Sequence, residues 1–185
     1  CSSDLDKVVI DGEGAAQVVS LENFTNVGEI NIQDFAGADN GSTDNISITN
    51  IGATQKVTIN SDTATQGDWV GDTITLDYNP TAITTAAPGA IQSASVEFKG
   101  VAPLSPAGTS AILITDSKTI TITDSIQSTT GNYTTGAIDV RGTADQSLTS
   151  LTLIGGGQAS STTQTLTVKA GAAAALTVLD ASAYN

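Results

Sequence analysis

The sequence predicts an all-β protein, and three observations carry that prediction. A three-residue unit with apolar first and last residues and a usually polar middle residue recurs along the 185-residue chain. In a strand, this alternation turns both apolar side chains to one face and the middle one to the other. The segments between the units are rich in the turn formers Gly, Asn, Asp, Ser and Pro. None of the apolar runs has the spacing of an amphipathic helix.

Expected strands follow one another along the whole chain. Two early segments, 8–10 and 18–21, are apolar and β-branched enough to form strands. The repeated units after them occupy residues 30–32, 46–48, 57–59, 74–76, 96–98, 112–114, 120–122, 138–140, 151–153, 166–168 and 176–178. Residues 170–175 have a helix-favouring composition, but Gly171 interrupts them and strands are expected on both sides, so we predict a turn there.

Short strands with two inward side chains each favour an irregular β-solenoid that resembles a parallel β-helix. In a solenoid every coil rests on its neighbours and shares one continuous core. The alternative is one or more β-sandwich domains, which need longer alternating strands and usually an aromatic-rich core. Only 4% of the residues are aromatic. The units are unevenly spaced, so we expect loops of different lengths between the strands.

For the domain organisation, we expect a single repetitive β region over residues 1–185, as a piece of a larger protein. The alternative is two β modules, 1–92 and 93–185. This alternative arises because all four prolines lie in two stretches, 79–91 and 101–108, that would serve as linkers.

Cys1 has two interpretations. A first residue Cys followed by Ser2, Ser3 and Asp4 is what a cleaved bacterial lipoprotein shows, and acylation there would anchor the chain to a membrane. The alternative, which we favour, is that the residue is the end of an excised fragment. We therefore expect a membrane as a partner only if Cys1 is lipidated. Because there is one Cys, an intramolecular disulfide is excluded.

The charge balance excludes several classes of function. The chain carries 19 acidic and 6 basic residues, a formal net charge of -13, and no histidine. A nucleic-acid-binding protein needs basic side chains to displace counterions from phosphate, so nucleic acid is excluded as a partner. Ser-His-Asp and Cys-His catalysis and His-ligated metal sites are excluded because they need imidazole.

Several phrases resemble the repetitive regions of bacterial surface-layer (S-layer) proteins and of the related large secreted adhesins. These phrases are NFTNVGEINI at 23–32, SITNIG at 47–52, TLTVKAG at 165–171 and LTVLDASAYN at 176–185. The likeness lies in composition and in the length of the expected strands: short strands rich in Thr, Ala and Gly in an acidic chain almost free of Cys and Met. It implies an extracellular structural module of a crystalline coat on the bacterial cell surface, often dependent on calcium.

Calcium ligands are inferred from oxygen-bearing side chains, because the Gly-Gly-x-Gly-x-Asp pattern of secreted repeat toxins does not occur. Calcium takes six to eight oxygens, which favours loops with several Asp and Asn at short spacing. The candidate ligands are Asp34, Asp39, Asn40 and Asp44 in one loop and Asp62, Asp68 and Asp72 in a second. A third acidic cluster contains Asp4, Asp6, Asp11 and Glu13. The alternative interpretation is that all of these are solvated turn residues.

An enzymatic alternative is a carbohydrate-active β-helix that uses paired carboxylates. Asp116 and Asp124 follow consecutive expected strands at matching offsets, so they would stack as a pair with Lys118 nearby. Aromatic platforms for sugars are few, and Arg141 is the sole arginine. Paired Asp residues after strands are usually turn residues, so we predict that the chain is not an enzyme.

The expected function is that of a structural module of a bacterial surface coat that assembles laterally with copies of itself in a lattice or fibre, with divalent cations between them. Acidic surfaces repel one another unless cations bridge them. The alternative is the stalk or binding section of a secreted adhesin. Cell-surface polysaccharide is a further expected partner.

Overall fold

The computed structural model shows an all-strand protein. It describes residues 6–11, 16–24, 27–34, 45–52, 54–61, 73–78, 93–100, 111–115, 117–126, 133–134, 137–141, 148–155, 164–165, 168–170 and 176–184. Among these residues there is no helix of the length and hydropathy that crossing a bilayer requires.

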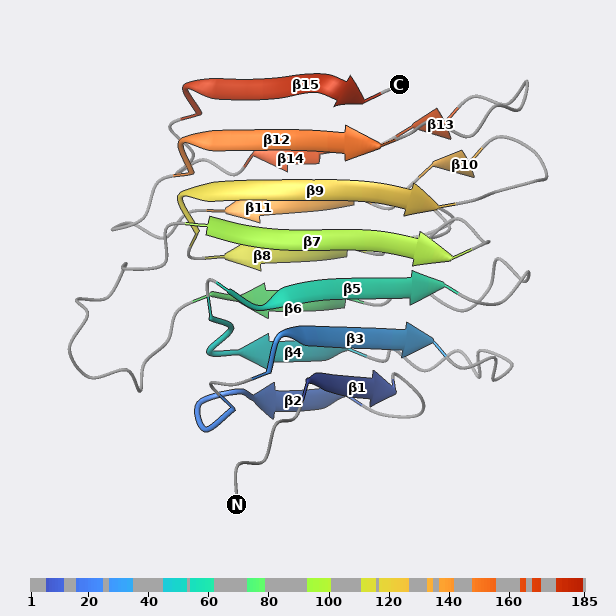
Figure 1. Ribbon diagram of the computed structural model, residues 1–185, viewed down its shortest axis with the longest axis vertical. Coiled ribbons are helices and arrows are strands. Elements are labelled where there is room, and N and C mark those ends of the chain that lie inside the picture. Colours follow the sequence, from blue (N-terminus) through green and yellow to red (C-terminus); the bar gives the residue numbers. More distant parts are fainter. Residues whose placement is uncertain are drawn as a thin grey trace.

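A seven-stranded sheet contains every second or third strand of the chain. In order across the sheet, its strands are β1 (Lys7–Asp11), β3 (Glu29–Asp34), β5 (Lys56–Ser61), β7 (Ser93–Gly100), β9 (Thr119–Ile126), β12 (Ser150–Gly155) and β15 (Val178–Tyr184). The order in the sheet is also the order in the chain. Each strand is therefore laid beside the one before it, as Figure 1 shows along the longest axis of the molecule.

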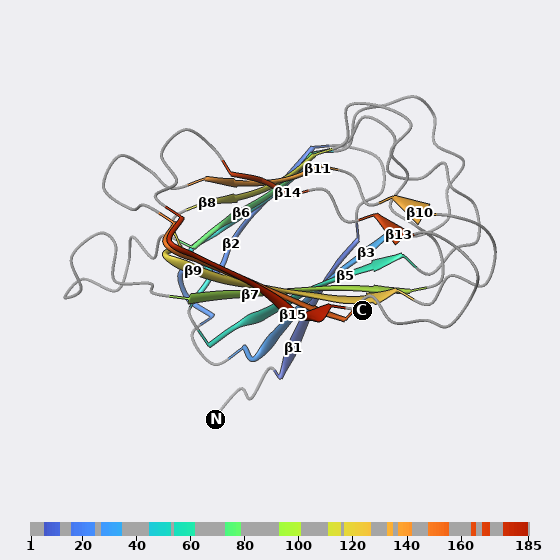
Figure 2. The ribbon, with the colours of Figure 1, turned by 90° about the horizontal axis from the view of Figure 1, so that it is seen from above.

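The intervening strands form a six-stranded sheet. From the N-terminal end, its strands are β2 (Gln17–Ser20), β4 (Ile46–Thr49), β6 (Thr73–Asp77), β8 (Ala111–Thr115), β11 (Ala137–Arg141) and β14 (Val168–Ala170). A small third sheet pairs β10 (Tyr133–Thr134) with β13 (Gln164–Thr165). Seen from above in Figure 2, the two large sheets face each other, and the chain alternates between them.

Every strand pairing in the described part of the chain is parallel. The all-β fold with parallel sheets of short strands is therefore confirmed, and the pairing differs from the antiparallel sheets of an immunoglobulin-type sandwich. The alternation between sheets is the strand order that a solenoid requires. Since the segments that would close each coil lie outside the described residues, the solenoid itself stays a prediction.

The distance along the chain from one strand to its neighbour in the sheet is uneven. Lys7 pairs with Glu29, 22 residues later, whereas Lys56 pairs with Ser95, 39 residues later. Both sheets continue across residue 92, because β5 pairs with β7 and β6 with β8. The division of the chain into domains stays a prediction.

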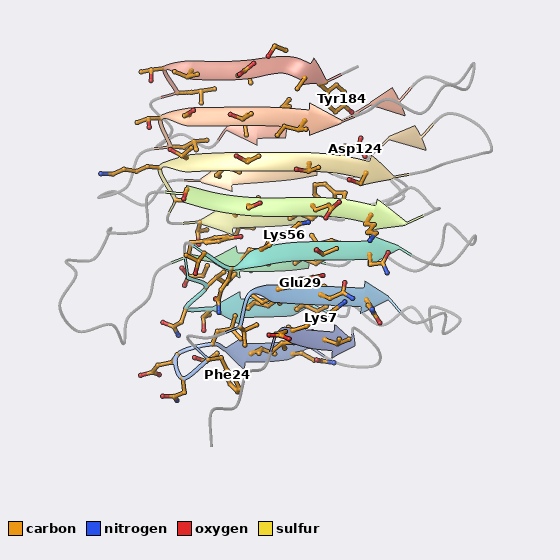
Figure 3. The ribbon with its side chains drawn as sticks, in the orientation of Figure 1. Lys7, Phe24, Glu29, Lys56, Asp124 and Tyr184 are labelled. Carbon is orange, nitrogen blue, oxygen red and sulfur yellow. The ribbon has the colours of Figure 1, made fainter. Side chains whose placement is uncertain are left out.

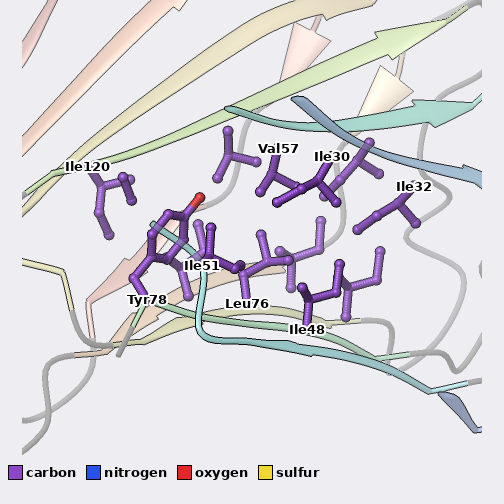
Figure 4. Packing of buried hydrophobic residues seen from close by; sticks show 14 of the residues in the cluster. Ile30, Ile32, Ile48, Ile51, Val57, Leu76, Tyr78 and Ile120 are labelled. Carbon is purple, nitrogen blue, oxygen red and sulfur yellow. The ribbon is translucent and has the colours of Figure 1, made fainter. Parts of the chain in front are cut away.

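The core consists of inward side chains stacked in columns between the two sheets. In the seven-stranded sheet, Ile30, Val57 and Val96 are register partners on three successive strands, and all three are fully buried. Ile48 and Leu76 form a similar column in the six-stranded sheet, as Figure 4 shows. Each such side chain contributes roughly 1.5–3 kcal/mol by burial. Stacking of β-branched residues thus replaces the aromatic bulk that the sequence lacks.

Tyr78 connects the two sheets at one end of this core. It follows β6, is buried, and its hydroxyl donates to the carbonyl oxygen of Ser95 on β7 at 3.4 Å. Desolvation by burial raises the pKa of Tyr78, despite the opposing effect of that hydrogen bond, so the phenol stays a hydrogen-bond donor at neutral pH.

Most of the predicted strands are found at the predicted positions, from residues 8–10 through the unit at 151–153. The last two units are placed differently. Of residues 176–178, only Val178 is in a strand, because the N–H groups of Thr177 and Val178 both donate to the carbonyl oxygen of Thr149 at a corner. Strand β14 likewise begins at Val168, and Leu166 lies outside the described residues.

Threonines form a stacked corner where strands of the seven-stranded sheet begin. The N–H groups of Thr149 and Ser150 donate to the carbonyl oxygen of Lys118, at 2.8 and 3.1 Å. Thr177 repeats this arrangement on Thr149, at the start of the next strand of the sheet. The hydroxyls of Thr149 and Thr177 donate to the same two carbonyl oxygens. Three consecutive strands therefore start in register.

We predict that Ile48→Ala lowers the free energy of unfolding by about 2–5 kcal/mol, because it opens a cavity in a fully buried column. The measurement is urea denaturation followed by circular dichroism. Val18→Ala is the matched control, since Val18 lies on the neighbouring strand but is 77% exposed, and its effect should stay within about 0.5 kcal/mol. Equal effects of the two substitutions would contradict this packing.

Candidate functional site

Charges of alternating sign line the outer face of the seven-stranded sheet at its N-terminal end. Lys7, Glu29 and Lys56 are register partners on β1, β3 and β5, and Figure 3 shows them one above another. The Lys7 Nζ lies 3.6 Å from the Glu29 Oε1, and Lys56 forms an ion pair with Glu97 on β7. The exposed pair of Lys7 and Glu29 contributes at most about 1 kcal/mol.

Glu97 is the most enclosed of these four charged residues. Its side chain is 15% exposed, and the Ser125 hydroxyl donates to its Oε1 at 2.7 Å. Burial raises the pKa of Glu97, but the hydrogen bonds from Lys56 and Ser125 and the charges of Lys56 and Lys99 outweigh burial. The net result is a lowered pKa, so this carboxylate stays ionised.

Two buried oxygens lie beside these charges. Asn31 and Thr58 are register partners in the column that leads to Glu97, and both are buried although they face outward. The Asn31 Oδ1 and the Thr58 Oγ1 have no hydrogen-bond partner within the described part of the chain. Buried polar atoms usually have partners. These two oxygens are therefore an exception to that rule within the described residues.

A carboxylate interrupts the apolar core at the other end of the sheet. Asp124 on β9 is the register partner of the buried Phe98, and it is itself buried. The Tyr184 hydroxyl on β15 donates to the Asp124 Oδ2 at 3.1 Å. Both residues are labelled in Figure 3. Tyr184 reaches across β12, where Gly155 is the register partner of both residues.

Gly155 makes room for this contact. Its φ is +104°, in the region that favours glycine, and a Cβ there would lie 2.0 Å from the backbone oxygen of Asp124. A side chain at this position would force β12 away from β9. The hydrogen bond between Tyr184 and Asp124 thus depends on a glycine on the strand between them.

A β-bulge turns Tyr184 inward. The register between β12 and β15 shifts after Thr152, which pairs with Asp180, and Ile154 then pairs with Ala183. The extra residue on β15 reverses which side chains face the core, and bulges commonly re-aim a side chain in this way. The Asp180 Oδ1 accepts a hydrogen bond from the Ser182 N–H at 3.0 Å, which closes the bulge.

The environment of Tyr184 favours its neutral form. Burial raises its pKa, and the charge of Asp124 and the hydrogen bond to it raise it further. The phenol therefore remains a donor to Asp124 at neutral pH. Ser182 has the opposite effect on Asp180: its hydrogen bonds hold the pKa of that exposed carboxylate below the usual range.

A buried glutamine that the sequence did not indicate holds a corner near the N-terminal end. The Gln55 Oε1 accepts the Gly52 N–H at 2.8 Å, and its Nε2 donates to the carbonyl oxygen of Phe24 at 2.9 Å. Phe24 itself is exposed. A lone Gln in a turn-rich segment gives no sequence signal for such a role.

The predicted calcium ligands lie almost entirely outside the described residues. Asp34 is the last residue of β3. The other predicted ligands lie outside the described residues: Asp39, Asn40, Asp44, Asp62, Asp68 and Asp72. Of the third cluster, Asp6 is exposed and Asp11 ends β1. In the part of the chain that is described, no three Asp, Glu or Cys side chains come together as a metal site. Calcium therefore stays a prediction.

The two strand ends that precede the Asp-rich segments are neighbours in the seven-stranded sheet. Asp34 and Ser61 end β3 and β5 and are register partners. The segments 35–44 and 62–72 begin after these two residues, and they lead to β4 and β6, which are also neighbours. Each segment therefore connects a strand of the seven-stranded sheet to a strand of the six-stranded sheet, and the strands that the two segments connect are neighbours in both sheets.

The enzymatic alternative placed Asp116 and Asp124 after neighbouring strands, and that premise is wrong. Strand β8 lies in the six-stranded sheet and β9 in the seven-stranded sheet, so consecutive strands are not neighbours in one sheet. Asp124 lies within β9 and faces the core, and Asp116 is outside the described residues. The expectation assumed that strands consecutive in the chain are neighbours in one sheet. In this fold, strands that are neighbours in a sheet are two or three strands apart along the chain.

Comparison of the chain with protein-family models, with curated proteins and with solved structures gives no match. The functional argument therefore rests on the residues and the strand arrangement.

We predict that Gly155→Ala lowers the free energy of unfolding by at least about 2 kcal/mol, because the new Cβ meets the Asp124 backbone at a positive φ. Thermal unfolding measures the effect. Gly28→Ala is the control: its added Cβ would have ordinary contact with the Asp6 oxygen at 3.7 Å. A tolerated Gly155→Ala would show that β9 and β12 do not approach as described.

We predict that Glu97 contributes stability that is lost on acidification. Its lowered pKa means that the contribution is fully present above the ordinary glutamate pKa of about 4.3 and disappears as the pH falls through the folded-state value. Glu97→Gln should therefore flatten the loss of unfolding free energy between neutral pH and about pH 3. Glu29→Gln removes an exposed ion pair instead and should change that slope less. Identical slopes for wild type and Glu97→Gln would refute the assignment.

Proposed function

We propose that this chain is a structural module of a bacterial cell-surface coat that assembles with copies of itself outside the cell. One observation carries the proposal: both large sheets end in strands that pair on one side only, within the described residues. These strands are β1 and β2 at one end and β15 and β14 at the other. Unpaired backbone groups on an edge strand are templates for pairing with another chain.

Exposed apolar side chains on the terminal strands support the same proposal. Val18 on β2 is 77% exposed, and Leu179 and Val178 on β15 are 62% and 49% exposed. Leu179 is the register partner of Leu151, which is buried because another strand covers it. A further strand beyond β15 would cover Leu179 in the same way. Burial of such side chains is the usual driving force for association.

Net charge gives a reason for divalent cations in this assembly. A net charge of -13 makes copies repel one another, and bound calcium would reduce that repulsion. The two Asp-rich segments that start at the register partners Asp34 and Ser61 supply the oxygen chemistry calcium prefers. In this proposal, calcium binds at that side of the stack and lets neighbouring copies approach laterally.

A second candidate function is the stalk of a secreted adhesin. The stacking direction of the strands is the longest dimension of the molecule in Figure 1, which suits a spacer that holds a binding region away from a surface. A stalk would need the stacked fold but not the lateral contacts. Both candidates are extracellular and non-enzymatic, and they differ in whether copies form sheets.

We predict that the chain forms ordered sheets in calcium and disperses in a chelator. Negative-stain electron microscopy and sedimentation velocity give the readout, and calcium should also raise the melting temperature, because a ligand that binds the folded state stabilises it. Isolated rods in both conditions would favour the stalk and contradict the coat.

Substitution of the acidic segment tests the calcium part separately. The triple change of Asp62, Asp68 and Asp72 to Asn should abolish most of the calcium-induced rise in melting temperature. Glu22→Gln is the control, because Glu22 is an exposed carboxylate on a turn outside the Asp-rich segments. If the triple variant responds to calcium like the wild type, calcium does not bind there.

A further inference from the structure

The two ends of the seven-stranded sheet present complementary edges. β1 is bonded to β3 along one edge, and β15 is bonded to β12 along one edge. Because all strands run parallel, the outer edge of β15 is the same edge that each earlier strand offers to its successor. A strand with the direction of β1 therefore continues the sheet beyond β15. The six-stranded sheet has the same polarity, with β2 at one end and β14 at the other.

The charges on the outer face specify a register for this continuation. Lys7, Glu29 and Lys56 alternate in sign along one column, and the same column, followed through the register partners on each strand, ends at Asp180 on β15. A β1 strand placed next to β15 in this register brings Lys7 beside Asp180. The junction then places opposite charges side by side, as the contact between Lys7 and Glu29 does inside the chain.

The bulge on β15 keeps the inward and outward faces matched in this register. Asp180 and Ala183 pair with the outward residues Thr152 and Ile154, and Tyr184 pairs with the inward position of Gly155. A β1 strand that pairs with the outer edge of β15 in the register that β12 has on the inner edge, bulge included, places Val9 beside Ala183 and Ile10 beside Tyr184. Val9, which is exposed, then faces outward next to a small side chain, and Ile10 extends the inward column.

We propose that β1 of one copy adds to the outer edge of β15 of a second copy as a parallel strand, with Lys7 beside Asp180. This proposal rests on the proposed self-assembling function and specifies one of its contacts, with the partner a second copy of this chain arranged head to tail. The same step brings β2 beside β14, so both sheets continue from copy to copy. Because the two copies use different surfaces, the contact is heterologous, and because it continues the stacking direction of both sheets, repeated contacts build a fibre.

Charge reversal tests the junction. Lys7→Glu places a glutamate beside Asp180, and Asp180→Lys places a lysine beside Lys7, so each variant alone should associate about five- to tenfold more weakly than the wild type. A mixture of the two variants should recover association, because the new carboxylate at position 7 of one copy then meets the new ammonium group at position 180 of the other, and the copies alternate. Sedimentation velocity in calcium-containing buffer measures the effect.

Matched variants separate this contact from other effects of charge. Lys99→Glu changes the net charge as Lys7→Glu does, but Lys99 is an exposed residue of β7 in the middle of the sheet, so association should change less than about twofold. Asp180→Asn keeps an oxygen that accepts the Ser182 N–H while removing the charge. It should weaken association less than Asp180→Lys, and it keeps the test usable if Asp180→Lys disturbs the bulge.

The outcomes distinguish the junction from the coat proposal. Weak association of each variant with recovery in the mixture supports the junction. Calcium-dependent sheets that form equally well with Lys7→Glu, or no recovery in the mixture of folded variants, would overturn the junction and leave the coat. A wild-type chain that stays monomeric with and without calcium would overturn both.

Discussion

In-register parallel pairing is the constraint on which the rest of the structure depends. Each strand must turn inward the same alternate positions as the strand beneath it, because a slip of one residue would expose the whole apolar set. Ile30, Val57 and Val96 satisfy this requirement on three strands that are far apart in the chain. The loops between strands differ in length without disturbing the columns. The corner formed by Thr149 and Thr177 contributes by starting the later strands at the same level.

Asp124 is the main exception to the apolar columns, and three other residues accommodate it. Gly155 removes the side chain that would lie against it, Tyr184 donates a hydrogen bond to it, and the Asp180 carboxylate holds the bulge that aims Tyr184 inward. Burial of a carboxylate without a partner would be costly. The arrangement ties β9, β12 and β15 together and so gives the last strand a polar attachment to the stack where its apolar contacts are few.

Strand positions could be predicted from the alternation of side chains, but strand neighbours could not. The unit around Ile120 is found where the pattern places it, whereas β8 and β9, which the alternative with paired Asp116 and Asp124 treated as neighbours, belong to different sheets. The two-residue strands β10 and β13 lack the apolar pattern altogether. The ion pair between Lys56 and Glu97 depends on the pairing of β5 with β7, which are separated in the chain by β6 and its flanking segments, and local sequence carries no signal for that pairing. The predicted calcium ligands lie almost entirely outside the described residues.

The outer edge of β15 is the same kind of strand edge that each internal strand offers to the next strand, and this links the architecture to the proposed assembly. Cryo-electron microscopy of assembled fibres is the most direct measurement of that link. The account predicts that parallel strands continue across the boundary between copies, about 4.7–4.9 Å apart along the fibre axis, with β1 next to β15. Fibres or sheets in which the strand spacing is interrupted at each boundary, or in which β1 and β15 face solvent, would contradict it.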